Sequence, residues 1–369
     1  MANVIDIIMR AMNSKTKLAI EEGLTGTLLF TAFIYLYYLI SVWGISDYII
    51  EGAFKDYVLG PGVHMEALIT GLGFGLFFCL VNRLSETQRV RRLSFGFIIL
   101  IKTVSYLLCL TLVYFIVNII LRLFFLTGEE IAALTQTVTP RFLISAGLWL
   151  ITSILAINFI FEVRKKIGPG NMIAFLTGRY QHPRLENRIF LFLDLKGSTT
   201  IAEQLGPKQY SRFLQHSFHD LTQIVLDFGA QIYQYVGDEV VLTWPTKWPQ
   251  YRELCMKTFF AFENKLQDRR DWYEKQFGLH PIFRGGVEEG SVTATEVGDI
   301  KREIAFHGDP LNTAARLLEL CKEFEKDILV SGTVGKALEN SSYFSTERQC
   351  ETILRGKEAA ISVYAVFPA

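Results

Sequence analysis

The chain has 369 residues, half of them hydrophobic, and a mean hydropathy of +0.27, which is too apolar for an ordinary soluble protein. Its 37 basic and 37 acidic residues balance, so the charge gives no indication of a nucleic-acid partner. Five cysteines without CxxC spacing indicate a reducing compartment and exclude a disulfide scaffold.

The apolar residues concentrate before residue 163. Four runs there are long enough, or nearly so, to span a bilayer: residues 24–44, 63–81, 103–124 and 142–161. Their length and their lack of a polar face distinguish them from buried helices of a soluble domain. We therefore predict an α-helical membrane domain over residues 1–162, with four spans in contact with lipid.

The charged residues around these runs predict the orientation. Acidic residues occupy the loops after the first and third runs, whereas basic residues precede the first run and follow the second and fourth: Arg10, Lys15, Lys17, Arg83, Arg89, Arg91, Arg92, Arg164, Lys165 and Lys166. We expect a multi-pass protein of the inner or plasma membrane, with both termini and the C-terminal half in the cytoplasm.

Residues 163–187 are predicted to be a cytoplasmic linker. Gly168-Pro-Gly170 ends the fourth helix, and residues 172–180 are compatible with one further short helix. The segment either carries a signal from the membrane domain or serves as a plain tether.

A first carboxylate follows a buried strand. Residues 189–193 form an apolar run too short for a helix, which predicts a central strand that ends at Asp194. The small residues of the turn 196–199 lead to a helix whose start is indicated by Thr200 and Glu203 at capping-box spacing. A strand end followed by a helix N-terminus offers backbone N–H groups to a phosphate.

A second carboxylate lies at a hairpin tip. Residues 230–236 and 240–244 are rich in strand-forming side chains and meet at Gly237-Asp238, where a tight primed turn requires a positive φ. Two carboxylates of this kind make the oxygen-rich site that magnesium prefers. Each alone is equally consistent with a simple turn.

Further along the chain, Asp309-Pro310 predicts the start of a helix over residues 311–324 that places Asn312 and Arg316 on one face. A solvated polar stripe is the alternative for this pair. The other predicted elements are a helix over 250–276, strands at 282–287, 291–297, 327–331, 351–354 and 361–367, and a short helix at 333–339.

Five motifs in this order and spacing resemble the catalytic domain of class III nucleotidyl cyclases. They are Phe192-Leu-Asp-Leu-Lys-Gly-Ser-Thr199, Tyr235-Val-Gly-Asp-Glu239, Phe283-Arg-Gly-Gly-Val287, Gly308-Asp-Pro-Leu-Asn-Thr-Ala-Ala-Arg316 and Leu354-Arg-Gly-Lys357. The resemblance covers about residues 188–367. It implies an α+β domain over residues 188–369, with a ferredoxin-like core and helices on one side of the sheet.

The resemblance also implies a role for each matched residue. Asp194, Asp238 and the backbone carbonyl of Leu195 would hold two Mg²⁺ or Mn²⁺ ions per active site. The phosphates would lie against Gly197, Ser198, Thr199, Arg284 and Lys357. Asn312 and Arg316 would position the ribose and stabilise the transition state. Because family members build each site between two chains, a homodimer with shared active sites is implied.

The base-reading positions depart from the adenylate cyclase pattern, since Gln234 replaces a lysine and Ala305 replaces an aspartate or threonine. An amide can hydrogen-bond either adenine or guanine, whereas Ala305 offers only packing. The interpretation is an adenylate cyclase that converts ATP to cyclic AMP and pyrophosphate. The alternatives are a guanylate or mixed-specificity cyclase and a silent nucleotide-binding membrane receptor. The sequence does not identify the stimulus.

Overall fold

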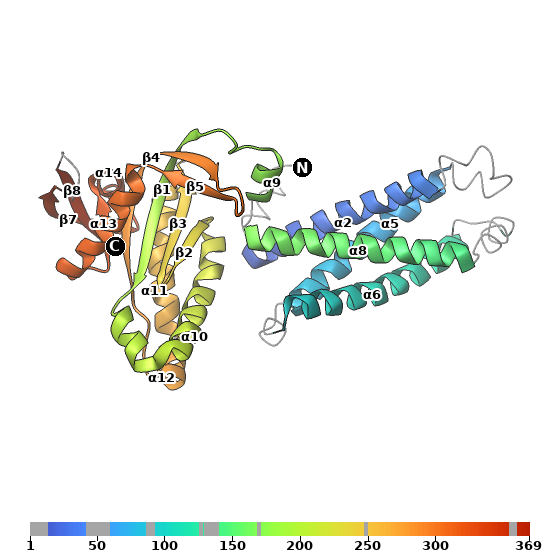
Figure 1. Cartoon of the computed structure of the whole chain (residues 1–369), viewed down its shortest axis with the longest axis horizontal. Coiled ribbons are helices and arrows are strands. Elements are labelled where there is room, and N and C mark those ends of the chain that lie inside the picture. The colour runs from blue at the N-terminus through green and yellow to red at the C-terminus, as the bar shows by residue number, and fades with distance from the viewer. Residues whose placement is uncertain are drawn as a thin grey trace. The chain divides into compact units, whose positions relative to one another are not determined.

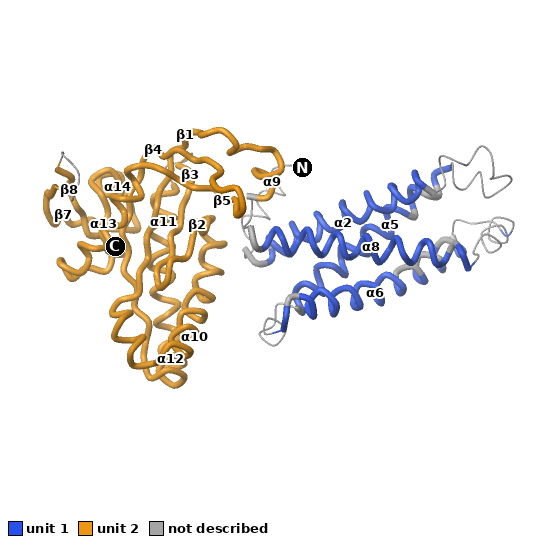
Figure 2. Tube along the Cα trace, viewed as in Figure 1, with its two compact units in different colours: residues 1–166 blue, residues 167–369 orange. Residues whose placement is uncertain are grey.

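The computed structural model describes residues 14–41, 60–85, 93–124, 128, 140–167, 171–246, 250–353 and 360–369. The chain divides into two compact units, residues 1–166 and residues 167–369 (Figure 2). The first unit is helical, whereas the second combines helices with one large sheet (Figure 1).

The described residues of the first unit form four long helices: α2 (Ser14–Ser41), α5 (Pro61–Ser85), α6 (Phe95–Phe124) and α8 (Pro140–Ile167). Three stretches within them, Leu18–Ile40, Ala67–Leu84 and Leu143–Lys165, are long and apolar enough to cross a membrane. In α6, the apolar stretch Gly96–Leu112 is shorter. Three candidate spans are therefore clear among the described residues, where the sequence predicted four.

Helices α2 and α5 approach closely because glycines face threonines between them. A Cβ added at Gly75 would lie 1.7 Å from Oγ1 of Thr27, and one added at Gly71 would lie 2.0 Å from Oγ1 of Thr31. Small residues that let helix backbones approach are typical of helix packing in membranes. Phe74 and the neighbouring Phe78 are buried beside this contact.

Polar side chains are buried between the helices near the start of α6 and the end of α8. Nζ of Lys102 in α6 lies 2.8 Å from a carboxylate oxygen of Glu162 in α8, and both side chains are largely buried. The hydroxyl of Tyr106 donates a hydrogen bond of 3.1 Å to Asn82 in α5. Charges inside a helical bundle of this kind are expensive unless they are paired.

The second unit is built on a sheet with the strand order β2-β3-β1-β4-β6-β8-β7, and β5 pairs with β4. The strands are β1 (Arg184–Leu195), β2 (Gln231–Val236), β3 (Glu239–Pro245), β4 (Phe283–Val297), β5 (Glu303–His307), β6 (Ile328–Ser331), β7 (Phe344–Thr352) and β8 (Ile361–Pro368). β4 and β6 are parallel, and all other neighbours are antiparallel. The sheet is therefore mixed, as expected of an α+β domain.

Helices cover both faces of this sheet, so the prediction of helices on one side was wrong. α10 (Ser198–Asp227), α11 (Gln250–Asp268), α12 (Arg270–Phe277) and α14 (Gly332–Leu338) enclose a core with Leu191 and Leu193 of β1. α13 (Asp309–Glu323) packs on the opposite face against Phe190 and Phe192. The strand is uniformly apolar because alternate side chains enter these two cores, a pattern that reveals burial on both faces.

Several predicted boundaries differ from the structure. The expected strands at 282–287 and 291–297 form the single strand β4, and the expected helix over 250–276 is interrupted at Arg269. β5 was not predicted, and β7 begins at Phe344 rather than at residue 351. Helix α10 begins at Ser198 after a left-handed Gly197, two residues before the predicted capping box.

The segment before β1 packs against the sheet of the second unit. Its short helix α9 (Asn171–Leu176) contributes Ala174 to a small cluster with Tyr180 and Ala294. The backbone N–H of Glu296 donates a hydrogen bond of 2.7 Å to the carbonyl of Tyr180. Residues 171–187 are thus attached to the sheet, while Gly168-Pro-Gly170 lies outside the described residues.

Candidate active site

Three charged side chains lie in one row across the centre of the sheet. Asp194 at the end of β1 is paired with Glu239 of β3 on one side and with Arg284 of β4 on the other. Residues paired across neighbouring strands project from the same face of a sheet. The carboxylates of Asp194 and Glu239 and the guanidinium of Arg284 therefore lie on one face, at the end where β1 finishes. The run 189–193, which is almost completely buried, fixes this position because a shift of one residue would exchange the two cores.

Asp238 joins this row from the hairpin between β2 and β3. Gly237 has a φ of 63°, as the tight turn requires, and Val236 pairs with Glu239 across a two-residue loop. The carboxylates of Asp194 and Asp238 are close enough to share a hydrogen bond. Burial and this neighbouring carboxylate raise the pKa of Asp194 to about 6.

The repulsion between the two carboxylates fits a divalent cation, which would relieve it. Glu239 is a third acidic group nearby, and burial together with Asp194 and Asp238 raises its pKa to about 7. Among the described residues, no group of three or more acidic, histidine or cysteine side chains is placed to hold a metal on its own. Two carboxylates completed by substrate phosphates are a normal arrangement for Mg²⁺.

The turn between β1 and α10 leaves backbone groups available beside these carboxylates. Gly197 has a φ of 71° and precedes the helix, and no side chain caps its first turn. The exposed residues Gly197 and Thr199 flank the half-buried Ser198. A helix N-terminus with free N–H groups is favourable for a phosphate.

Arg284 is paired with Asp194, close to the start of this turn. Its Nε is buried and has no hydrogen-bond partner among the described residues. A buried unpaired guanidinium N–H is costly, which makes the position suited to an anionic ligand. Lys357, the other predicted phosphate-binding residue, lies outside the described residues.

The residues next to the two predicted base-reading positions contact each other within one chain. Gln234 is exposed on β2 and follows an irregularity in the pairing of β2 with β3, whereas Ala305 is half-buried on β5. Tyr233 joins the two strands, because its hydroxyl accepts a hydrogen bond of 3.2 Å from the backbone N–H of Phe306. The rings of Tyr233 and Phe306 also pack edge to face.

Asn312 and Arg316 share one face of α13, as predicted, and this face is not among the buried residues of the helix. The first turn of α13 packs against Gly290, since a Cβ there would lie 2.7 Å from Pro310. Gly290 pairs with Arg188, six residues before Asp194 on β1. Six residues of extended strand span about 20 Å, so α13 begins well away from Asp194 along the sheet. The helix then runs back towards it, since Gly286, which pairs with Phe192, faces the backbone of Ala314 and Leu318.

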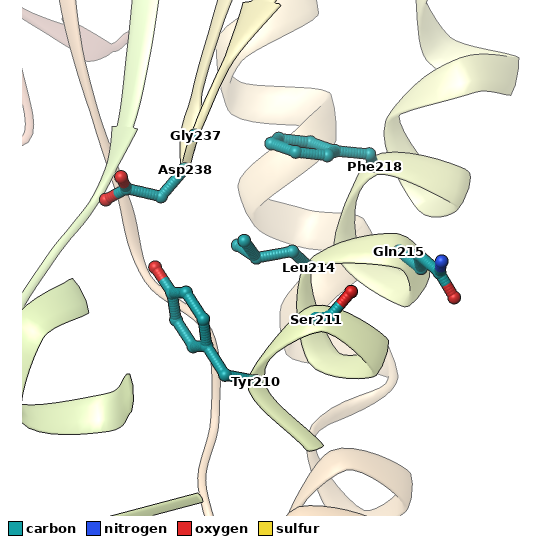
Figure 3. Close-up of a pocket in the computed structure, with 7 residues that line it drawn as sticks. All are labelled: Tyr210, Ser211, Leu214, Gln215, Phe218, Gly237 and Asp238. Atoms are coloured by element: carbon teal, nitrogen blue, oxygen red, sulfur yellow. The ribbon is translucent and has the colours of Figure 1, made fainter. Parts of the chain in front are cut away.

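The sequence analysis missed one polar group near the carboxylates. Tyr210 lies on α10, shortly before the apolar residues Phe213 and Leu214. In the structure the Tyr210 ring is half-buried and its hydroxyl points towards Asp238 (Figure 3). The Gly206-Pro207 pair could have indicated this position, because it breaks the helix. The side chains after the break point in other directions than an uninterrupted helix would give them.

Comparisons with known proteins agree with this geometry. Residues 180–367 match the family model described as the Adenylate and Guanylate cyclase catalytic domain. The chain is 29% identical over 301 residues to Adenylate cyclase 2 of Rhizobium meliloti (strain 1021), with 81% of this chain and 83% of the relative covered. It is 28% identical to an adenylate cyclase of Anabaena cylindrica over 48% of this chain and 36% of that protein. The solved structure of a bacterial light-regulated adenylyl cyclase shares the fold, with a TM-score of 0.51 and 21% identity over 59% of this chain and 64% of that one.

Proposed function

The chain belongs to the family of adenylate and guanylate cyclase catalytic domains, and we propose that it is a membrane-anchored enzyme converting ATP to cyclic AMP and pyrophosphate. The predicted enzyme class, an adenylate cyclase and therefore a lyase, agrees with the family and with the relatives that carry this name. The observation that carries the proposal is the close pair of Asp194 and Asp238 beside the unpaired Nε of Arg284.

In the proposed reaction the ribose 3′-oxygen attacks the α-phosphorus and pyrophosphate leaves. Asp194, Asp238 and the carbonyl of Leu195 would hold two Mg²⁺ or Mn²⁺ ions, which lower the pKa of the attacking hydroxyl and neutralise phosphate charge. The turn at Gly197, Ser198 and Thr199 would bind the phosphates through backbone N–H groups. Arg284, together with Lys357, would offset the negative charge that the leaving group gains.

The site would be completed by a second copy of the chain. Asn312 orients the ribose and Arg316 binds the equatorial oxygens of the α-phosphate in this proposal. This arrangement is the one that the resemblance to class III nucleotidyl cyclases implies, in which each active site is built between two chains. A homodimer with two-fold symmetry would bring each Asn312 and Arg316 to the partner's carboxylates.

Residues 1–162 would anchor the enzyme through four spans, including α6, with residues 163–187 as the cytoplasmic linker to the domain over 188–369. The basic residues favour a cytoplasmic catalytic domain. A reporter inserted after Val163 should be cytoplasmic and one inserted beside Glu129 external. External labelling after Val163 would contradict this topology.

The experiment that tests the proposed function is product formation by the full-length chain in membranes. ATP and GTP are supplied in parallel with Mg²⁺ or Mn²⁺, and Asp238→Asn serves as the matched variant. We expect cyclic AMP from the parent chain and a loss of at least 100-fold in kcat for the variant, the scale on which lost transition-state electrostatics act. Equal rates for the two proteins would refute the assigned site, whereas cyclic GMP as the main product would identify a guanylate cyclase.

A further inference from the structure

One arginine is buried on the face of the sheet that carries Asp194. Arg188 lies on β1 six residues before Asp194, so the two side chains project from the same face, and only 5% of Arg188 is exposed. Its Nε donates a hydrogen bond of 2.9 Å to Oε2 of Glu186, and Nη1 donates one of 3.0 Å to Oε1 of Gln231 on β2. A buried guanidinium is costly unless its N–H groups are paired, so these contacts hold the side chain in one position.

The same guanidinium also covers an aromatic ring of β5. Its central carbon lies 4.5 Å from the centroid of the Phe306 ring, a distance typical of a cation–π contact. Among the described strands, β5 pairs only with β4 (Figure 1). Side-chain contacts must therefore help to fix β5, and Arg188 supplies one of them while it also holds β2 through Gln231.

These two strands carry the predicted base-reading positions. Ala305 directly precedes Phe306 on β5, and Gln234 follows Tyr233 on β2. Gln234 pairs with Val241, which belongs to the cluster on the Asp194 face, so its side chain projects from the same face as Arg188. A movement of β5 relative to β2 would therefore change the spacing of the two base-reading positions.

Glu186 connects Arg188 to the segment before β1. Its other carboxylate oxygen, Oε1, accepts a hydrogen bond of 2.9 Å from the hydroxyl of Tyr180 and one of 3.1 Å from Arg179. The Tyr180 ring packs in the cluster with Ala174 of α9. One carboxylate thus joins the segment that follows the helical unit in the chain to the arginine that contacts β2 and β5.

We propose that Arg188 is a positioning residue for the nucleoside base, and that Glu186 makes its position depend on the segment that precedes β1. This inference rests on the proposed function, because it takes Gln234 and Ala305 as the positions that contact the base. Arg188 itself does not touch the nucleotide. Its loss should weaken the binding of a nucleoside triphosphate and leave the binding of bare triphosphate unchanged.

The test compares two ligands that differ in whether they carry the nucleoside: adenosine 5′-(α,β-methylene)triphosphate, which cannot release pyrophosphate, and inorganic triphosphate. Their binding to the full-length chain in nanodiscs is measured by calorimetry with Mn²⁺ present. Arg188→Lys keeps the charge but removes the planar group that stacks and donates in two directions. Arg184→Lys is the matched control, because Arg184 is exposed on the same strand.

We expect Arg188→Lys to bind the adenosine analogue about tenfold more weakly, the effect of a lost hydrogen bond or cation–π contact, and to bind inorganic triphosphate as the parent does. Arg184→Lys should bind both ligands normally. An equal loss for the two ligands would show a general structural effect and would overturn the inference. Unchanged affinity for the analogue, or a parent chain that binds it no more tightly than triphosphate, would also overturn it.

Hydrogen exchange tests the role of Glu186. Glu186→Gln keeps the size of the side chain and removes its charge, so exchange should become about tenfold faster both in residues 171–180 and in β5. Glu303→Gln is the control, because Glu303 is an exposed residue of β5 that pairs with Lys301. Faster exchange confined to residues 171–180 would overturn the connection.

Turnover separates this inference from the proposed function. Arg188→Lys should raise KM for ATP about tenfold and leave kcat almost unchanged, because the residue acts on binding of the base and not on the transition state. A fall in kcat without a change in KM would overturn the inference. A parent chain without turnover would refute the proposed function, while a loss of affinity confined to the adenosine analogue would still support the role of Arg188.

Discussion

Gly286 offers the sharpest test of how the sheet holds α13. A Cβ at this position would lie 2.2 Å from the carbonyl oxygen of Ala314 and 2.5 Å from the backbone nitrogen of Leu318. Backbone atoms cannot rotate away, so Gly286→Ala must displace the helix. Overpacking of this kind costs about 1–3 kcal/mol.

The adjacent glycine provides the control. Gly285 faces the opposite core, where a Cβ would meet side-chain atoms of Phe259 and Leu191 at 3.1 and 3.2 Å. Those side chains can shift by a few tenths of an ångström, so Gly285→Ala should have the smaller effect. Both variants replace glycine with alanine in the same strand, so they differ only in the core that the new methyl group enters.

The assay is hydrogen exchange of α13 peptides in the full-length chain. A loss of about 1–3 kcal/mol in local stability corresponds to exchange that is about 5- to 150-fold faster. We expect this acceleration for α13 in Gly286→Ala, together with reduced turnover because Arg316 moves with the helix. Exchange in α13 that is equally fast in both glycine variants would refute the packing argument.

Three further predictions concern the buried ion pair, the base and the metal. Lys102→Met should destabilise the helical unit by about 3 kcal/mol, because Glu162 keeps an unpaired charge, and adding Glu162→Leu should restore most of the thermal stability; no recovery would show that the pair is not coupled. Gln234→Lys combined with Ala305→Asp should raise the preference for ATP over GTP, measured as the ratio of the two kcat/KM values, by about 1–3 kcal/mol. A parent chain that already excludes GTP by about four orders of magnitude would disprove these base-reading assignments. Since the pKa of Asp194 is raised to about 6, Mn²⁺ affinity should fall about tenfold per pH unit below pH 6, as the proton competes with the ion. The metal-free protein should become more stable as pH falls from 6 towards 4, because the folded state then binds the extra proton. Asp194→Asn should weaken this stability trend but not abolish it, because burial also raises the pKa of Glu239 to about 7.

The strands and turns that carry the candidate site were predictable because local rules determine them. The apolar run before Asp194, the glycine of the hairpin at Asp238 and the proline that starts α13 each have a short-range signal, and the structure contains all three elements. The family followed from the order of the motifs, and the match over residues 180–367 confirms it.

The remaining features depend on contacts between distant residues. The unbroken apolar run of β1 indicates burial on both faces, but it does not show which helix covers each face, so the position of α13 on the second face was not visible in the sequence. β5 is short and half-exposed, and it exists because it pairs with β4. Tyr210 fits an apolar helical pattern, and only the break at Gly206 indicates that its hydroxyl could point towards Asp238 (Figure 3).

The most direct test of the central claim, a cyclase whose active site is shared between two chains, is complementation. Asp194→Ala and Arg316→Ala chains with different affinity tags are expressed together, and mixed dimers are isolated by both tags. Each variant alone should form no cyclic AMP, whereas a mixed dimer holds one site with both substitutions and one with neither, so it should recover about half of the parent rate. Verified mixed dimers that form no cyclic AMP would contradict the account.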